Sequence, residues 1–388
     1  MTPVAVAAVG ASWEAVALAA VEASDHLTLA RRCVDLAELL AVTRTGAARV
    51  AVVDTGLAGL DLDAVRDLTE AGVRVVSCGD AATAQALGIA VHCPPEDLGR
   101  IDFDQPEEEV PTETVQAVPE RRGGRVVTVW GPAGAPGRSS LAVALASAAA
   151  AREPGMTVAL VDADVAGGAL APMLGVLDEV SGVLAACRAA AQARAEEVPQ
   201  HLLEIEPGLG LLTGLARPDQ WPLLRAGAFE QAVERLRGQV DLVVVDVGSG
   251  LDLDGGGARS RHAVARQGLE QADLLVAVGR SDPLGLARLV RGLNEVRDLL
   301  AALPHALVVN RHRPTLGWSE REVAETIWRL AGVRPEAFLP DDPACLDAAM
   351  MVGITPRAAA PQSPFVLAVD ALVTSLLTRS AVVASPSP

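Results

Sequence analysis

Short apolar runs alternate with amphipathic runs along nearly the whole of this 388-residue chain. In the first part of the chain, this alternation predicts five strands with helices between them. Strands that alternate with helices form parallel sheets covered on both faces, so we expect residues 1–96 to fold as a small doubly wound α/β domain. The expected strands are Val4–Val9, Leu27–Arg31, Arg49–Val53, Arg74–Cys78 and Ile89–Cys93, and the expected helices are Ser12–Glu22, Leu36–Thr43, Leu60–Ala71 and Ala81–Leu87.

A glycine-rich segment marks the beginning of a second domain. Residues 131–140 read Gly-Pro-Ala-Gly-Ala-Pro-Gly-Arg-Ser-Ser, between the apolar run Arg125–Trp130 and the helix-like run Leu141–Ala151. Strand, glycine-rich turn and helix are the layout of a phosphate-binding loop, in which backbone N–H groups and the helix N-terminus point at an anion. The residues expected to bind phosphates are Gly134, Gly137, Arg138, Ser139 and Ser140, and the Ser139 hydroxyl is also expected to bind Mg²⁺.

Acidic residues end two later apolar runs. Thr157–Val161 is followed by Asp162 and Asp164, and the run that begins at Asp241 ends at Asp246. The carboxyl ends of parallel strands form the crevice in which open α/β sheets bind ligands. Carboxylates at that edge can hold Mg²⁺ or orient an attacking water. We therefore predict that Asp162, Asp164 and Asp246 are catalytic and that Asp246 is also a Mg²⁺ ligand.

The remaining sequence suggests a linker, a long second domain and a tail. Residues 97–124 are rich in proline and glutamate and poor in large apolar side chains, which is typical of a linker. The second domain is expected over residues 125–379, where further strands are predicted at Leu274–Val278 and Ala306–Val309. Residues 380–388 are expected to be a disordered tail.

The composition excludes several classes of protein. The net charge of −17 argues against a surface that binds nucleic acid through its phosphates. The five cysteines are scattered and never spaced as Cys-x-x-Cys, which predicts neither a disulfide framework nor a zinc site and fits a reducing cytoplasm. No apolar run is long enough to cross a membrane, and a signal peptide is not expected because the N-terminus lacks a basic region.

Over about residues 124–379, the motifs resemble the deviant-Walker family of MinD/ParA-type ATPases, and most closely its actinobacterial CpaE/TadZ-like branch. They are Val129–Ser140, Val161–Asp164, Asp241–Asp246, Val309–Arg311 and Phe338–Asp342. The resemblance implies a P-loop NTPase domain that binds ATP or ADP with Mg²⁺. It gives Asp246 the role of the Walker B acid and one of Asp162 and Asp164 the role of positioning the hydrolytic water. Asn310 would bond adenine, and Pro340 and Asp342 would flank the base.

The first domain resembles a response-regulator receiver domain in its topology. Asp54 stands where a receiver carries its phosphorylated aspartate, but Gly10-Ala11-Ser12 replaces the acidic pair that holds Mg²⁺. We therefore interpret Asp54 as the start of a turn and the domain as a pseudo-receiver used for docking or dimerisation. A degenerate receiver ahead of the ATPase domain is the arrangement found in the CpaE/TadZ-like branch.

Two cations of the family are missing. All 32 basic residues of the chain are arginine. The lysine of the loop falls at Arg138, and the lysine that reaches the partner's nucleotide falls at Ala133. A cation that stabilises transition-state charge accelerates phosphoryl transfer by several powers of ten. The resemblance thus implies nucleotide binding with weak or absent ATP hydrolysis, and it leaves open whether the chain acts as an enzyme.

The resemblance further implies a homodimeric positioning or scaffold protein in Flp/Tad-type pilus assembly, with protein partners in that machine. It places the protein in the cytoplasm, at a pole or a septum. A septum-site, cell-division or chromosome-partitioning regulator of the same family is the alternative, with partners in the division machine. A DNA-segregating protein would need a basic face, which the net charge argues against. Peripheral membrane contact through Ser363–Leu377 stays open, although the lack of a basic flank favours core packing of that helix.

A less favoured alternative is an NAD(P)-dependent oxidoreductase, since a glycine-rich turn followed by an acid also describes a Rossmann fold. Here the glycines are spaced Gly-x-x-Gly-x-x-Gly, and the helix opens with Arg-Ser-Ser, which suits phosphates and Mg²⁺ better. A Tyr/Lys catalytic pair is impossible because the chain contains neither residue.

Overall fold

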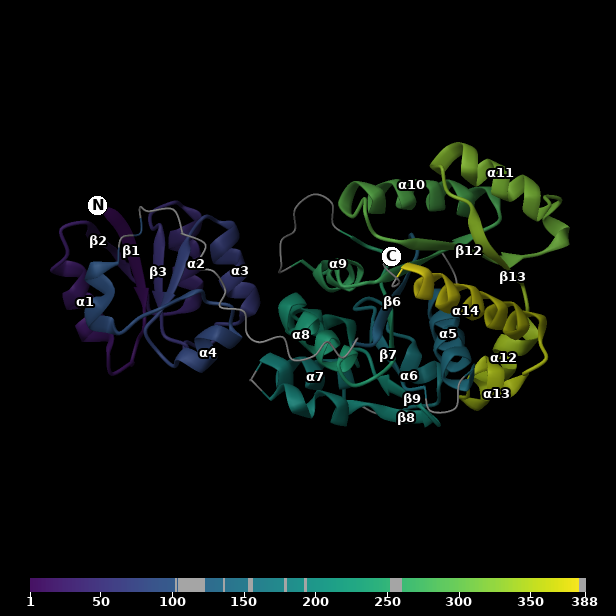
Figure 1. The fold of residues 1–388 in the computed structure, drawn as a ribbon, viewed down its shortest axis with the longest axis horizontal. Coiled ribbons are helices and arrows are strands. Elements are labelled where there is room, and N and C mark those ends of the chain that lie inside the picture. The colour runs from purple at the N-terminus through teal and green to yellow at the C-terminus, as the bar shows by residue number, and fades with distance from the viewer. Residues whose placement is uncertain are drawn as a thin grey trace. The chain divides into compact units, whose positions relative to one another are not determined.

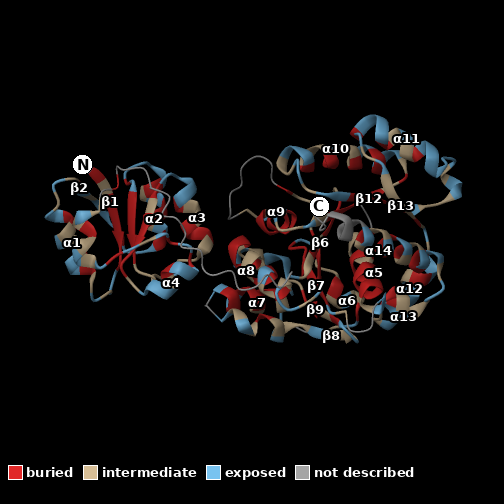
Figure 2. Cartoon of the chain, in the orientation of Figure 1, coloured by how far each residue is buried: buried red, intermediate tan, exposed pale blue. Residues whose placement is uncertain are grey.

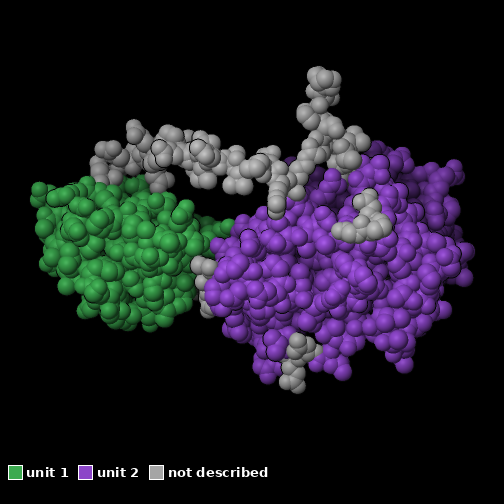
Figure 3. All heavy atoms as spheres, turned by 60° about the horizontal axis from the view of Figure 1, so that its bottom comes forward, with its two compact units in different colours: residues 1–121, 191–193 green, residues 122–190, 194–388 purple. Residues whose placement is uncertain are grey.

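The computed structural model describes residues 1–101, 103, 123–134, 137–152, 156–177, 180–191, 194–251 and 260–383. It divides the chain into two compact units, residues 1–121 with 191–193 and residues 122–190 with 194–388 (Figure 3). Most of the expected linker, residues 104–122, and the last tail residues, 384–388, lie outside the described part of the chain. Each unit is built around its own sheet, with helices on both faces (Figure 1).

The sheet of the first unit has five parallel strands in the order β2-β1-β3-β4-β5, the order of one of the common doubly wound folds. Alternate residues of β1 pack into the cores on opposite faces, Val4 and Val6 on one face and Ala5 and Ala7 on the other. The elements are β1 Thr2–Ala7, α1 Glu14–Glu22, β2 Leu27–Arg32, α2 Leu36–Arg44, β3 Val50–Val53, α3 Leu62–Glu70, β4 Arg74–Ser77, α4 Ala81–Ala86 and β5 Val91–His92.

The first unit extends beyond its last strand. Pro95–Arg100 form a 3-10 helix, and Leu98 and Phe103 are buried in the core beside β1. Apolar side chains at these positions gain free energy by leaving water. Residues 97–101 and Phe103, expected as part of the beginning of the linker, therefore belong to this unit.

The sheet of the second unit has eight strands in the order β13-β12-β11-β6-β10-β7-β9-β8, in which only the β8–β9 pair is antiparallel. Figure 2 shows that the central strands are buried. The strands are β6 Arg125–Trp130, β7 Val158–Ala163, β8 Leu203–Glu206, β9 Leu209–Leu212, β10 Leu242–Val247, β11 Leu274–Arg280, β12 His305–His312 and β13 Pro335–Pro340.

Helices cover both faces of this sheet. Side chains of α5, α12 and α14 pack into the core on one face, and those of α7, α8, α9, α10 and α11 into the core on the other. The helices are α5 Arg138–Arg152, α6 Leu170–Met173, α7 Gly182–Ala191, α8 Ala226–Arg237, α9 Ala263–Glu270, α10 Pro283–Leu299, α11 Glu320–Ala331, α12 Pro343–Val352, α13 Pro356–Ala359 and α14 Pro364–Val383.

The last helix, α14, packs against α5 and β13. Its apolar side chains Phe365, Val369 and Leu372 are almost completely buried. This arrangement agrees with core packing of the segment expected at Ser363–Leu377. Among the described residues, no helix combines the length and the apolar character needed to cross a membrane.

Candidate functional site

The glycine-rich loop joins β6, near the middle of the sheet, to α5. Gly134 and Gly137 have φ angles of +78° and +92°, a backbone conformation that glycine adopts without steric cost. Helix α5 begins at Arg138, directly after the loop, so its free N–H groups lie at the loop. Ala135 and Pro136 lie outside the described residues. The observed strand, turn and helix match the layout predicted from the sequence.

The alternation of side chains along the strands places the predicted acids on the face of the sheet that α5 covers. In β10, Val243 and Val245 belong to the core on the far face, whereas Val244 packs toward α5. Because side chains alternate between faces, Asp246 lies on the α5 face. The same alternation places Asp162 of β7 there, and these two acids are paired in register on neighbouring strands.

The carboxyl group of Asp246 is buried beside the Ser139 hydroxyl. Its side chain is 1% exposed, and no described group meets the geometry of a hydrogen bond to either oxygen. Burial raises its pKa to about 8, and the charge of Asp162 adds to the rise, whereas the nearby Ser139 hydroxyl and Arg138 guanidinium lower it. An unpaired buried carboxyl group is costly. A cation bound beside Asp246 would remove this cost.

The carboxylate of Asp162 is held by the backbone that follows it. Leu170 N donates to Oδ2 at 3.1 Å, and Asp164 N donates to Oδ1 at 3.3 Å. Burial raises the pKa of Asp162 to about 6, although these N–H groups oppose the rise. Gly214 lies so close that a β-carbon there would stand 2.6 Å from Cγ of Asp162. Glycine is thus required where the end of β9 approaches this acid.

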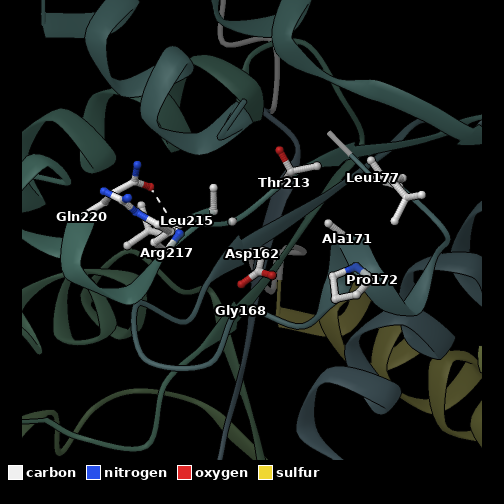
Figure 4. A pocket seen from close by; sticks show the side chains of 12 residues that line it. Asp162, Gly168, Ala171, Pro172, Leu177, Thr213, Leu215, Arg217 and Gln220 are labelled. Atoms are coloured by element: carbon white, nitrogen blue, oxygen red, sulfur yellow. Dashed lines mark hydrogen bonds between the residues drawn. The ribbon is translucent and has the colours of Figure 1, made fainter. Parts of the chain in front are cut away.

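A cavity of about 690 Å³ lies beside Asp162 (Figure 4). Its wall combines polar side chains, Thr213 and Gln220, with apolar ones, Pro172 and Leu177. A polar cavity of this size can hold water molecules. Asp162 therefore lies next to Asp246 at the carboxyl ends of the strands and also lines a cavity that water can enter.

Arg138 folds back onto its own loop. Its Nη1 donates to the carbonyl oxygen of Gly131 at 2.8 Å, and Nη2 lies 3.5 Å from Oδ2 of Asp164. The other oxygen of Asp164 accepts from the backbone N–H groups of Ala166, at 2.9 Å, and Gly167, at 3.2 Å. The loop cation and the second acid of the Asp-Ala-Asp motif thus form a pair at the site.

Asn310 reaches the loop from the other side of β6. Its side chain is 3% exposed. Val308 packs toward α5 and Val309 away from it, so the alternation of β12 places Asn310 on the α5 face of the sheet. A β-carbon at Gly137 would collide with the amide nitrogen of Asn310. The late strand and the phosphate loop, far apart in sequence, are therefore in contact.

The two residues predicted to flank the base, Pro340 and Asp342, follow Asn310 in the sequence and lie at and just after the end of β13. Pro340 ends β13 and pairs in register with His312 of β12. Asp342 caps α12, and its Oδ1 accepts from Cys345 N at 3.2 Å. This capping bond gives Asp342 a structural role besides the predicted one.

The donor set suits Mg²⁺ bound together with a phosphate. Among the described residues, no group of three or more His, Cys, Asp or Glu side chains is arranged to hold a metal ion. Mg²⁺ in nucleotide sites uses one or two protein ligands, with phosphate oxygens and waters completing its shell. Asp246 fits that requirement, because its two oxygens lie beside the Ser139 hydroxyl and receive no well-formed hydrogen bond from the described residues.

Some features of the site go beyond the sequence analysis. Ser140, predicted beside the phosphates, lines a narrow cleft with Met173 and Leu346. The sequence analysis did not single out Gly214 or Arg288. The signal for Gly214 was a glycine two residues after the apolar run of β9, but for Arg288 the sequence gives no signal.

No protein-family model and no curated protein matches the chain. Solved structures do match. A ParA-family ATPase from Chlorobium tepidum is 19% identical, with a TM-score of 0.55 over 65% of this chain and 99% of that one. The septum site-determining protein MinD from Pyrococcus horikoshii, complexed with Mg-ADP, is 18% identical, with a TM-score of 0.53 over 68% and 100%.

MinD from the Aquifex aeolicus MinC:MinD cell division complex is also 18% identical, with a TM-score of 0.52 over 68% of this chain and 97% of that one. At such low identity, a shared structure establishes the fold and leaves the activity to be argued from the site. The chain therefore contains the α/β fold of the ParA and MinD ATPases.

Proposed function

We propose that the second unit binds ATP or ADP with Mg²⁺ at the glycine-rich loop. The observation that carries this proposal is the carboxyl group of Asp246, buried beside the Ser139 hydroxyl at the first turn of α5, with no well-formed hydrogen bond from the described residues. A backbone loop that attracts an anion and an acid that needs a cation together suit a magnesium–phosphate complex. The MinD structure complexed with Mg-ADP shows that the fold accommodates this ligand.

Each predicted residue has a place in this proposal. Gly134, Gly137, Arg138 and the start of α5 hold the phosphates, and Ser139 with Asp246 holds Mg²⁺. When bound, the ion supplies charge neutralisation for the phosphate oxygens. The remaining assignments are Ser140 beside the phosphates, Asp162 and Asp164 toward the hydrolytic water, and Asn310, Pro340 and Asp342 around adenine.

We propose that hydrolysis is weak or absent. The loop cation is an arginine, whose planar fork presents its donors differently from the ammonium group of lysine. This arginine is already engaged by Gly131 and Asp164. Ala133 offers no charge to a partner's nucleotide. The protein would then form a homodimer that nucleotide controls only loosely.

At the level of the cell, we propose a cytoplasmic positioning or scaffold protein for Flp/Tad-type pilus assembly, at a pole or septum. The first unit would act as a docking pseudo-receiver, because the carboxylate of Asp54 is bonded within its own chain. A septum-site or partitioning role is a second candidate, favoured by the likeness to MinD from a MinC:MinD complex. Deleting the gene distinguishes them, since loss of pili supports the first and misplaced septa support the second.

Calorimetric titration with ATP and ADP, in the presence of Mg²⁺, tests the nucleotide proposal. We expect both nucleotides to bind and phosphate release by the native protein to be slow or undetectable. The Arg138→Lys variant should bind and should release phosphate faster than the native protein. Absence of binding to either nucleotide would refute the proposal, and rapid turnover by the native protein would refute impaired hydrolysis.

A further inference from the structure

We propose that Arg288 of α10 binds the phosphate chain of the nucleotide and supplies, within the same chain, the cation that is missing at Ala133. This inference rests on the proposed function, because it assigns a further residue to the same site. It concerns a side chain contributed from the face of the sheet opposite α5.

Helix α10 is fixed against the first half of the loop. Gly292 lies so close to β6 that a β-carbon there would stand 2.8 Å from the Trp130 ring and 3.1 Å from Cβ of Pro132. The Trp130 ring is itself held by a bond of 3.2 Å from its Nε1 to the carbonyl oxygen of Ser249. Residues four positions apart lie on one face of a helix, so Arg288 points to the same side as Gly292, one turn earlier.

The guanidinium of Arg288 touches the loop. A β-carbon at Gly134 would collide with Nη1 of Arg288, and Cζ would lie 3.2 Å away. Glycine at this position therefore permits both the positive φ angle and the approach of the arginine. Gly134 directly follows Ala133, the position where the family carries its additional lysine. The cation thus arrives beside the same part of the loop from a different element.

No counter-charge among the described residues satisfies Arg288. Within the described part of the chain, its half-buried guanidinium forms no ion pair, whereas Arg138 pairs with Asp164 and Arg280 with Asp282. Backbone N–H groups of the loop and an unpaired guanidinium both attract an anion. Guanidinium groups bind phosphate through strong, charge-assisted hydrogen bonds, and arginines supplied in cis assist other P-loop proteins.

Substitution of Arg288 tests this inference by titration with Mg²⁺ and either AMPPNP or ADP. We expect Arg288→Gln to weaken AMPPNP binding by about tenfold or more, the loss that corresponds to one charge-assisted hydrogen bond. The loss for ADP should be smaller, because ADP carries less charge. Arg291→Gln is the matched control, since Arg291 is exposed on the same helix and its substitution removes the same charge. Thermal unfolding checks that both variants are folded.

A second variant tests whether the cation itself matters. Adding Ala133→Lys to Arg288→Gln should restore AMPPNP affinity to within about threefold of the native value, and failure to restore it would contradict the replacement of one cation by the other. This inference alone would be overturned if the native protein bound AMPPNP and Arg288→Gln bound it equally well. It would also be overturned if Arg288→Gln and Arg291→Gln lost the same amount of affinity. Absence of binding by the native protein would overturn the proposed function and this inference with it.

Discussion

Both sheets of the protein carry an aspartate at the carboxyl end of a central strand. Asp54 directly follows β3 in the first unit, and Asp246 lies near the end of β10 in the second. In both sheets the strands around the aspartate are parallel, so both acids occupy the edge at which open α/β sheets bind ligands. The two sites nevertheless differ in how the carboxyl group is satisfied.

Asp54 is satisfied within its own chain. It is partly exposed to water, Trp13 Nε1 donates to its Oδ1 at 3.2 Å, and Gly56 N donates to its Oδ2 at 3.1 Å. The bond to Gly56 is typical of an aspartate that begins a turn. Asp246 receives no well-formed hydrogen bond from the described residues, although the Ser139 hydroxyl lies near it, and it is only 1% exposed to water. The same topology can thus carry a carboxylate that needs nothing further and one that needs a proton or a metal ion.

The largest expected difference between the two acids is in Mg²⁺-dependent nucleotide binding. Asp246→Asn should weaken the binding of ATP with Mg²⁺ by at least about tenfold, because loss of even the outer partners of metal ligands costs 10–100-fold in affinity. Asp54→Asn should leave the affinity unchanged. Calorimetric titration of both variants, with Mg²⁺ and with EDTA, measures the effect.

Loss of folding cannot produce this result, since an amide at position 246 removes a buried acid and should stabilise the free protein. Equal nucleotide affinities for Asp246→Asn and the native protein would show that the orphaned carboxyl group is not a Mg²⁺ ligand. An equal loss in Asp54→Asn would remove the proposed contrast between the two edges.

In the second unit, β6, β7, β10, β11 and β12 could be predicted from their continuous apolar side chains, but β8, β9 and β13 could not. The run predicted at Arg125–Trp130 forms β6 with the same bounds. In contrast, β8 and β13 were missed, because Leu203–Glu206 carries two glutamates and Pro335–Pro340 begins and ends with proline. Both lie at the ends of the sheet, where few apolar contacts are required and proline is tolerated.

The site shows the same division. Strand alternation and register bring Asp162 and Asp246 together, so their proximity could be inferred from two apolar runs that end in acids. The contacts of Gly214 with Asp162 and of Arg288 with Gly134 depend on how loops and helices pack across the sheet. No local pattern encodes that packing. It had to be seen in the structure.

The pH dependence of stability should also reveal the buried carboxyl group of Asp246. The pKa of Asp246 is about 8 and that of Asp162 about 6 in the folded chain, against 3.8 for an ordinary aspartate. Above about pH 4 the folded state therefore binds more protons than the unfolded state, and its stability falls as the pH rises. The contribution of Asp162 is lost up to about pH 6, and that of Asp246 up to about pH 8. From pH 6 to 8 the contribution of Asp246 should cost about 2 kcal/mol, at roughly 1.4 kcal/mol per unit at most.

Urea denaturation at pH 6, 7 and 8 measures this dependence as the difference in unfolding free energy between the native protein and Asp246→Asn. The advantage of Asp246→Asn should grow with pH across this window. A constant difference for Asp246→Asn would mean that its carboxyl group is already ionised at pH 6 and has a partner.

The smallest expected effect concerns the bond that satisfies Asp54. Trp13→Phe keeps most of the aromatic surface and removes the indole donor, so it should lower the unfolding free energy by about 1 kcal/mol, the usual net worth of one hydrogen bond. Trp318→Phe is the control, because Trp318 is 37% exposed and no bond from its indole to the described residues is found. Thermal unfolding compares the two, and nucleotide affinity should be unchanged in both. If Trp13→Phe were as stable as the control, water would satisfy Asp54 equally well, and the two acids would differ only in burial.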